Sequence, residues 1–426
     1  MDDLPDLVKV EILCRLPCKY VVRCKCLSKH WLTLISDSDP YFVSRFQCLL
    51  GPERTLLFSP TPKDRFTMNE LSGLKTLGSF RPSFQPNDHQ SNLKPIVVAT
   101  CNDLVLCCKT PICIRREYFI CNPYTRQFVS LPIAPPSTPG VSVGFINCDS
   151  DHKKEQTTGG NSNITGYKVV QIPYFGYDTA AFQFKVDIFS FKTGEWRDYL
   201  VSCQLFRFQV SNRLVSSQLG SRFQVLNRAG IAYNGVLYWS GPNGFLIGID
   251  PFNPKETTGS RSSGDIIEHK YGYFIGFNEH LEPCIDLLDQ LDVSHGSCLR
   301  PCQLYRKQCI LRVWELKEVQ EEQLVNQGNS KWCLTYKVSL EQIVWQDQKI
   351  DLHCKGSKLL ALDPNNDDVL YLKLDGQIVI CNIRTSELKI AKLLIINYSP
   401  WPYNGVFPFV FPSWPTPVPK LPPQKE

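Results

Sequence analysis

The sequence predicts a mostly β-sheet protein with a small α-helical module at its N-terminus. In residues 1–46 apolar residues recur with the period of an α-helix, whereas from about residue 54 short apolar strands alternate with polar turns. Six strand–turn–strand units follow one another at a spacing of roughly 60–70 residues, which is typical of a β-propeller. We therefore expect a propeller-like domain of about six blades. A β-sandwich is the alternative, although it would not need equal spacing.

The first 46 residues predict three short helices. The first helix begins near Pro5 and ends at Pro17, because proline fits the first turn of a helix but interrupts its interior. A second helix is predicted for residues 19–26 and a third for residues 28–36, with Ser28 as the N-cap. The apolar face of the first helix is formed by residues four positions apart and one neighbour: Leu4, Val8, Ile12, Leu16 and Leu13.

Such a module is too small to be stable by itself. Three helices of about ten residues bury too little of their apolar surface. Their apolar faces must therefore meet something else. Either they pack on the rest of this chain, or they form half of an interface that another protein completes. The residues alone favour neither alternative.

A resemblance decides between these alternatives. The N-terminal segment resembles the F-box at Leu4-Pro5, Glu11-Ile12-Leu13, Arg15-Leu16-Pro17, Lys25-Cys26-Leu27-Ser28-Lys29, Trp31, Leu34-Ile35 and Phe42. The resemblance places an F-box at residues 1–46 and implies that it docks the chain onto the Skp-type linker of cullin–RING ubiquitin ligases. Two positions depart from the family pattern. Leu7 stands where an acidic residue is usual, and Lys9 stands where a leucine is usual.

The resemblance also implies a function and a binding surface. The chain would be a non-catalytic substrate-recognition adaptor of an SCF-type ubiquitin ligase, with the linker and, through it, a cullin as partners. The protein substrate and the residues that bind it stay unknown. Lys19, Arg23 and Lys25 would complement an acidic linker. The implied linker-binding residues are Leu4, Pro5, Ile12, Leu13, Leu16, Pro17, Val21, Val22, Leu27 and Trp31.

The predicted β-domain spans residues 54–411. Its six units are residues 56–60 with 66–68, 118–123 with 127–131, 186–191 with 195–197, 245–251, 311–316 with 332–336, and 378–382 with 388–390. Further strands are predicted at 102–107, 234–239 and 368–372. Residues 406–411 would close the ring, with Pro408 at an edge or a bulge. Residues 412–426 form a proline-rich tail, which we expect to be extended or disordered.

A second, more diffuse resemblance covers roughly residues 95–411. This region is similar to the F-box-associated, kelch-like β-domains of plant proteins. The similarity is carried by four short stretches: Cys121-Asn122-Pro123, Gly166-Tyr167-Lys168-Val169-Val170, Thr193-Gly194-Glu195-Trp196 and Leu311-Arg312-Val313-Trp314. It implies the same propeller-like fold and a surface for a protein substrate.

Other chemistry finds little support. Residues 140–144 fit the catalytic pattern G-x-S-x-G, but that motif needs a helix after the serine, and strand-like residues 145–148 follow instead. We therefore predict a blade strand there. The cysteines gather at 14–26 and 298–309 without the C-x2-C spacing of structural zinc sites, so we expect no metal. No glycine-rich nucleotide motif occurs, so no cofactor is expected.

Composition limits the remaining classes. A net charge of +5 on 426 residues gives no case for nucleic-acid binding. The uncharged stretch 393–419 is interrupted by prolines, so no membrane span is expected. The acidic start lacks a signal sequence, and 19 cysteines then indicate reduced thiols in the cytoplasm or nucleus. An enzyme built on a propeller and an F-box scaffold outside a ligase are the alternative functions.

Overall fold

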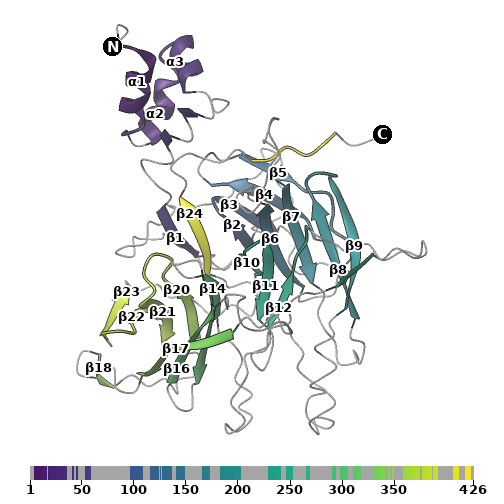
Figure 1. The fold of residues 1–426 in the computed structure, drawn as a ribbon, viewed down its shortest axis with the longest axis vertical. Helices are drawn as coiled ribbons and strands as arrows, with labels where there is room; N and C mark the ends of the chain where they lie inside the picture. Colours follow the sequence, from purple (N-terminus) through teal and green to yellow (C-terminus); the bar gives the residue numbers. More distant parts are fainter. Residues whose placement is uncertain are drawn as a thin grey trace, which may run out of the picture.

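A computed structural model shows three helices beside a large β-domain (Figure 1). The structure describes residues 4–16, 18–35, 41–42, 45–46, 53–58, 96–108, 116–123, 125, 127–136, 141–148, 166–172, 183–202, 229–240, 246–252, 265–268, 290–293, 298–305, 310–317, 331–340, 344–345, 348–349, 358–374, 377–385, 387–391, 406–411 and 418–423.

The helices lie where the sequence predicts them, but they are shorter. They are α1 (Asp6–Leu13), α2 (Cys18–Cys24) and α3 (Lys29–Leu34). The predicted N-cap is confirmed, because Oγ of Ser28 accepts a hydrogen bond from the backbone N–H of Trp31 at 3.3 Å. α1 ends early because the N–H of Leu16 bonds to the carbonyl of Leu13, three residues back, which tightens the last turn.

Three sheets have four antiparallel strands in chain order, which is the composition of a propeller blade. The first contains β2 (Ile96–Cys101), β3 (Leu104–Cys108), β4 (Tyr118–Asn122) and β5 (Gln127–Ser130). The second contains β14 (Gln290–Val293), β15 (Leu299–Tyr305), β16 (Ile310–Lys317) and β17 (Lys331–Ser339). The third contains β20 (Lys358–Leu362), β21 (Val369–Leu374), β22 (Gln377–Asn382) and β23 (Glu387–Ala391).

Two other sheets depart from four strands. One has three: β10 (Ile231–Tyr233), β11 (Val236–Ser240) and β12 (Leu246–Ile249). The other has five: β6 (Ser142–Cys148), β7 (Gly166–Ile172), β8 (Gln183–Ser190), β9 (Glu195–Ser202) and β13 (Asp265–Glu268). β13 follows β12 in the chain but pairs parallel with β9, so it belongs to the β6–β9 sheet and not to the β10–β12 sheet. A short pair, β18 (Val344–Trp345) and β19 (Gln348–Lys349), contacts β23.

The sheets are arranged in a ring. One strand of each sheet contacts one strand of the next, in the order β24, β2, β6, β10, β14, β20 and back to β24. The ring is closed by β1 (Glu53–Phe58), which pairs antiparallel with β24 (Val406–Phe411). The described strands therefore form a propeller of six strand groups, and the fold predicted from the spacing is confirmed.

Most predicted hairpins are confirmed as well. They are β4–β5, β8–β9, β16–β17 and β22–β23. For the first predicted unit the structure shows another pairing, of residues 56–58 with 406–408 from the other end of the chain. Its expected return strand, residues 66–68, lies outside the described residues. The turns before β3 and β11 are tight, since Asn102 and Asn234 have positive φ values of 53° and 47°.

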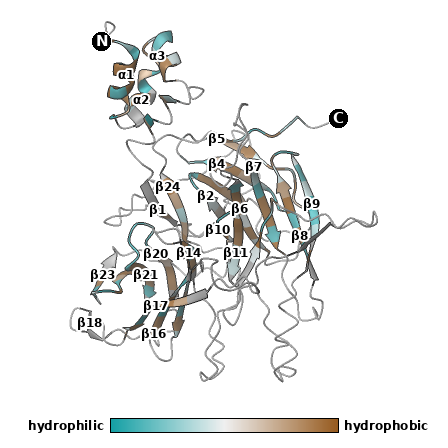
Figure 2. Ribbon diagram, viewed as in Figure 1, coloured by the Kyte–Doolittle hydropathy of each residue, from teal (hydrophilic) through white to brown (hydrophobic). Residues whose placement is uncertain are grey.

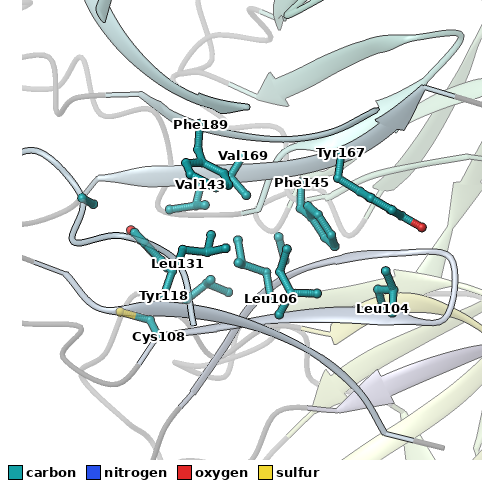
Figure 3. Packing of buried hydrophobic residues seen from close by; sticks show 14 of the residues in the cluster. Leu104, Leu106, Cys108, Tyr118, Leu131, Val143, Phe145, Tyr167, Val169 and Phe189 are labelled. Carbon is teal, nitrogen blue, oxygen red and sulfur yellow. The ribbon is translucent and has the colours of Figure 1, made fainter. Parts of the chain in front are cut away.

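The largest apolar cluster lies between the β2–β5 and β6–β9 sheets (Figure 3). We call it the seam cluster; it contains Val98, Ala99, Leu104, Leu106, Cys108, Tyr118, Ile120, Leu131, Ala134, Val141, Val143, Phe145, Tyr167, Val169, Phe189 and Phe191. Side chains from both sheets face one another across it. A buried hydrogen bond also joins the two sheets, from Nε2 of Gln171 to Oη of Tyr118 at 2.9 Å. Apolar packing and this bond together fix the two blades to each other.

The proline-rich tail continues this packing. Residues 418–423 have no regular secondary structure, and the side chains of Val418 and Leu421 pack against the seam cluster. Pro422 lies against Gly194, in the turn between β8 and β9. Figure 1 shows this segment, in yellow, at the end of the β-domain that is nearer the helices. This part of the tail is therefore extended and attached to the propeller.

The serine of the G-x-S-x-G pattern is a strand residue. Ser142 lies in β6, its side chain is buried, and β6 continues to Cys148 without a helix. The prediction of a blade strand is therefore confirmed. Among the described residues, no group of three His, Cys, Asp or Glu side chains is placed to hold a metal ion. None of the helices in this part of the chain has the length and apolar character of a membrane span.

Candidate partner-binding surface

The helical module has a core of its own. Its buried side chains are Val10, Leu13, Cys14, Val21, Trp31, Ile35, Phe42 and Phe46, with Cys24 and Leu34 partly buried against them. All of these residues belong to the module, so the described strands of the propeller contribute nothing to this core. Burial raises the pKa of the Cys14 thiol to about 11, which keeps it protonated as a small apolar group.

A bidentate ion pair joins the beginning of the module to its end. Nε of Arg45 donates to Oε1 of Glu11 at 2.5 Å, and Nη2 of Arg45 donates to Oε2 at 3.1 Å. Arg15 lies 3.6 Å from the same carboxylate. The hydrogen bonds from Arg45 lower the pKa of Glu11 below its ordinary value of 4.5. The pair therefore holds the segment around Phe42 and Phe46 against α1.

A second polar contact ties α1 to α3. Oδ1 of Asp6 accepts a hydrogen bond from Nζ of Lys9 at 3.2 Å and lies 3.0 Å from Nε2 of His30. The hydrogen bond from Lys9, followed by the contact with His30, lowers the pKa of Asp6. Lys9 itself is buried along its length and reaches Asp6 with its charged end. This explains how a lysine fits where the F-box pattern usually has a leucine.

The outer side of the module carries an unusual share of exposed apolar side chains. Among the described residues, eight of the eleven exposed large apolar side chains lie between positions 4 and 41. Leu7 and Leu27 are the most exposed, at 66% and 67%. Figure 2 shows hydrophobic segments on all three helices. We call the set the module surface: Leu4, Leu7, Val8, Leu16, Tyr20, Leu27, Leu32 and Tyr41.

The predicted linker-binding residues divide between this surface and the core. Leu4, Pro5, Leu16 and Leu27 are exposed, and Ile12 is half-buried. Leu13, Val21 and Trp31 lie in the module core, because helices this short need their largest inward-facing side chains to hold them together. These three side chains are buried and expose at most 8% of their surface. Pro17 and the side chain of Val22 lie outside the described residues.

The structure shows further exposed apolar residues that the sequence prediction did not name. Leu7, Val8, Tyr20, Leu32 and Tyr41 are exposed and apolar beside the predicted residues. Val8 has the four-residue spacing of the apolar face of α1, so the sequence could have placed it with Leu4 and Leu16. The ion pair of Glu11 with Arg45 has no such signal, because 34 positions separate the two residues.

The comparisons with known proteins match both parts of this architecture. The family model of the F-box domain matches residues 1–43, and the model described as F-box protein At3g26010-like, beta-propeller, matches residues 66–399. The chain belongs to this family of F-box β-propeller proteins. The kelch-like detail of the second resemblance stays a prediction. β1 and β24, which close the ring, lie just outside the residues that the propeller model matches.

Two relatives from Arabidopsis thaliana illustrate the similarity. The F-box protein At5g03970 is 21% identical over 430 residues, which cover 95% of this chain and 87% of that protein. The putative F-box protein At3g52320 is 34% identical over 140 residues, which cover 31% of this chain and 34% of that protein. Similarity to the first relative therefore extends over both the module and the propeller.

Solved structures resemble the chain only distantly. A putative 6-phosphogluconolactonase from Bacteroides uniformis is 10% identical, with a TM-score of 0.31 over 65% of this chain and 62% of that one. A similarity of this size supports no conclusion about fold or activity. The assignment of the F-box β-propeller family rests on the family models and on the ring of sheets.

Proposed function

We propose that this F-box β-propeller protein is a non-catalytic substrate-recognition adaptor of an SCF-type ubiquitin ligase. The F-box would bind a Skp-type linker and, through it, a cullin. The propeller would hold a protein substrate, and ubiquitin transfer would take place on other subunits. Binding would then accelerate transfer by raising the effective concentration of the substrate near the ubiquitin carrier.

The concentration of exposed apolar side chains on the helices supports this proposal most directly. The module core is formed by the module's own residues, and the apolar side chains of the module surface stay exposed, which supports a role in binding another protein. Exposed apolar side chains gathered on one small module are typical of protein interaction sites. The module surface lies on the F-box, the domain through which this family docks.

Charge on the second helix supports the same partner. Arg23 is exposed on α2 and carries the positive charge that an acidic linker surface would meet. Such complementary charge accelerates the encounter more than it strengthens the final complex. Raised ionic strength should therefore slow association while dissociation changes little.

The proposal is tested by pull-down of a Skp-type linker with the full-length chain. The test variant replaces two exposed leucines of the module, Leu16→Asp with Leu27→Asp. We expect linker binding to fall by at least tenfold, because two charges would be buried in an apolar interface. The matched control is Leu334→Asp, which alters an exposed leucine on β17, far along the chain from the module.

Equal binding by the double variant and the wild type would contradict the docking assignment. Loss of binding in the Leu334→Asp control would instead show that the assay reports general damage. Co-purification of a cullin with the wild-type chain from cell extract separates a ligase adaptor from an F-box scaffold that acts outside ligases. We propose a cytoplasmic or nuclear location for this complex, and fractionation of the tagged chain tests it.

A further inference from the structure

The tail segment 418–423, which we call the strap, packs against the propeller. Val418 and Leu421 pack against the seam cluster, to which the β2–β5 and β6–β9 sheets both contribute. Pro422 reaches the turn between β8 and β9, where it lies against Gly194. The strap therefore lies against the seam cluster and the neighbouring β8–β9 turn.

The side chains of the strap follow a period of three. Val418 and Leu421 face the propeller and are half-buried, whereas Lys420 and Pro423 are exposed. Residues three apart share one side of a polyproline II helix, and prolines at 419, 422 and 423 restrict the backbone to that region. The strap thus packs apolar side chains against the propeller and leaves every third residue, Lys420 and Pro423, exposed to solvent. Extended proline-rich ligands are recognised in this way.

The propeller surface is shaped for such a segment at Gly194. A Cβ atom at this position would lie 2.9 Å from Cγ of Pro422 and 3.3 Å from Cδ, so only glycine lets the proline ring approach this closely. Among the described residues, Val418, Leu421 and Pro422 hold the strap to the propeller through apolar contacts. A segment held by a few apolar contacts is readily exchanged for a similar one.

We propose that the surface beneath the strap is a binding site for an extended, proline-containing segment of a protein substrate, and that the strap competes for it from within the chain. The ligand would carry two apolar residues three positions apart, each followed by proline, as Val418-Pro419 and Leu421-Pro422 are. This inference rests on the proposed adaptor function for its biological meaning. Its test requires no linker protein.

The test uses a fluorescently labelled peptide with the sequence of residues 416–424. Its binding is measured by fluorescence anisotropy to two full-length chains, the wild type and a release variant with Val418→Asp and Leu421→Asp. We expect the release variant to bind the peptide at least tenfold more tightly, because the tethered strap has a high effective concentration in the wild type. Equal binding to both chains, or no binding to a release variant that unfolds cooperatively, would overturn the proposal.

A pair of glycine variants locates the site. Gly194→Asn in the release variant places a side chain where the proline ring sits, and we expect peptide binding to fall at least tenfold. Gly235→Asn is the matched control, because Gly235 also has a positive φ, 76° against 72°, but a Cβ there meets no atom within 4 Å. Asparagine tolerates this backbone region, so neither change should disturb its turn. Equal effects of the two changes would refute the location.

If the release variant does not fold, a measurement on the wild-type chain tests the same competition. Lys420 is exposed within the strap, so trypsin cleavage after it reports how often the strap leaves the propeller. An excess of the peptide with Lys420→Gln should accelerate this cleavage several-fold by displacing the strap. An unchanged cleavage rate at saturating peptide would contradict competition. Either failure would leave linker docking by the F-box unaffected, because no step here involves the module.

Discussion

Glu53 and Phe411 are opposite each other in the antiparallel pair that closes the propeller. The segment that follows the helical module therefore enters the ring at the position where the last strand leaves it. Two further contacts fix this closing strand to the neighbouring blade: Oγ1 of Thr100 donates to the carbonyl of Pro408 at 2.6 Å, and the N–H of Val410 donates to the carbonyl of Asn102 at 3.0 Å. The ends of the β-domain are thus joined to each other and to the first four-stranded sheet.

Ring closure should depend on the phenylalanines of β24. Phe409 is buried in a cluster with Val97, Val105 and Phe119, which belong to the β2–β5 sheet. We expect Phe409→Ala to lower the free energy of unfolding by about 3–5 kcal/mol, through lost burial and the cavity that remains. Urea unfolding of the full chain measures this loss. Phe128→Ala is the matched control, because Phe128 is a strand phenylalanine that is 48% exposed, and it should change little. Similar losses in both variants would mean that β24 has no special role.

Two glycines make room for an indole between neighbouring blades. Gly144 and Gly230 pair across the β6–β10 junction, and a Cβ at either would lie 2.7 or 2.6 Å from the ring of Trp239. We expect Gly230→Ala to destabilise the protein by about 1–3 kcal/mol, because the tightly packed ring cannot move aside without strain. Thermal unfolding followed by tryptophan fluorescence measures this effect. Gly166→Ala should be close to neutral, since a Cβ there meets its nearest atom at 3.9 Å. A neutral Gly230→Ala would show that Trp239 can repack.

A buried arginine joins the last two four-stranded sheets. Arg300, on β15, is 1% exposed; its Nε lies 3.1 Å from Oε1 of Glu315, and its Nη1 donates to the carbonyl of Asp367 at 3.0 Å. We expect Arg300→Met to cost about 3–5 kcal/mol of stability, because Glu315 and the carbonyl of Asp367 would lose the buried partner that they share. Chemical denaturation gives the value. Arg197→Met breaks an exposed pair with Glu195 and should cost under about 1 kcal/mol. Equal costs would indicate that Arg300 is solvated in solution.

The ion pair of Glu11 with Arg45 should make the module sensitive to acid. The pKa of Glu11 is lower in the folded chain than its ordinary value of 4.5, so the pair stabilises the fold above that pH. Its contribution should disappear as the pH falls through the lowered pKa. Amide hydrogen exchange of α1 in the wild type and in Glu11→Gln measures this. We expect faster exchange in the variant at neutral pH and similar exchange in the two chains in acid. A difference that persists in acid would assign the effect to packing.

The sequence predicts the local hairpins of this protein better than the pairings between strands that are far apart in the chain. Hairpins such as β4–β5 and β22–β23 depend on local alternation and on turn residues, which a single sequence displays. The partner of β1 could not be found in this way, because its residues pair with a strand at the other end of the chain. The same holds for β13, whose parallel pairing with β9 follows from tertiary contacts and not from its own pattern.

The helical module shows the same limit within a short segment. Periodicity identifies the apolar residues of α1, yet it does not say which of them face inward. Leu13 is buried and Leu16 is exposed, although both belong to the predicted apolar face. That division depends on how α2 and α3 pack on α1, and on Arg45, which holds the end of the module in place. A resemblance to the F-box locates the domain, and only the fold separates its core from its surface.

The connection between the module and the propeller sets a distance limit. Phe46 belongs to the module core and Glu53 begins β1, so seven residue steps separate the two bodies. A fully stretched chain of this length spans about 25 Å at most. A substrate held on the propeller would therefore stay within a short, fixed range of the linker protein. Its lysines would sample only a restricted zone of space, and that restriction would select which of them receive ubiquitin.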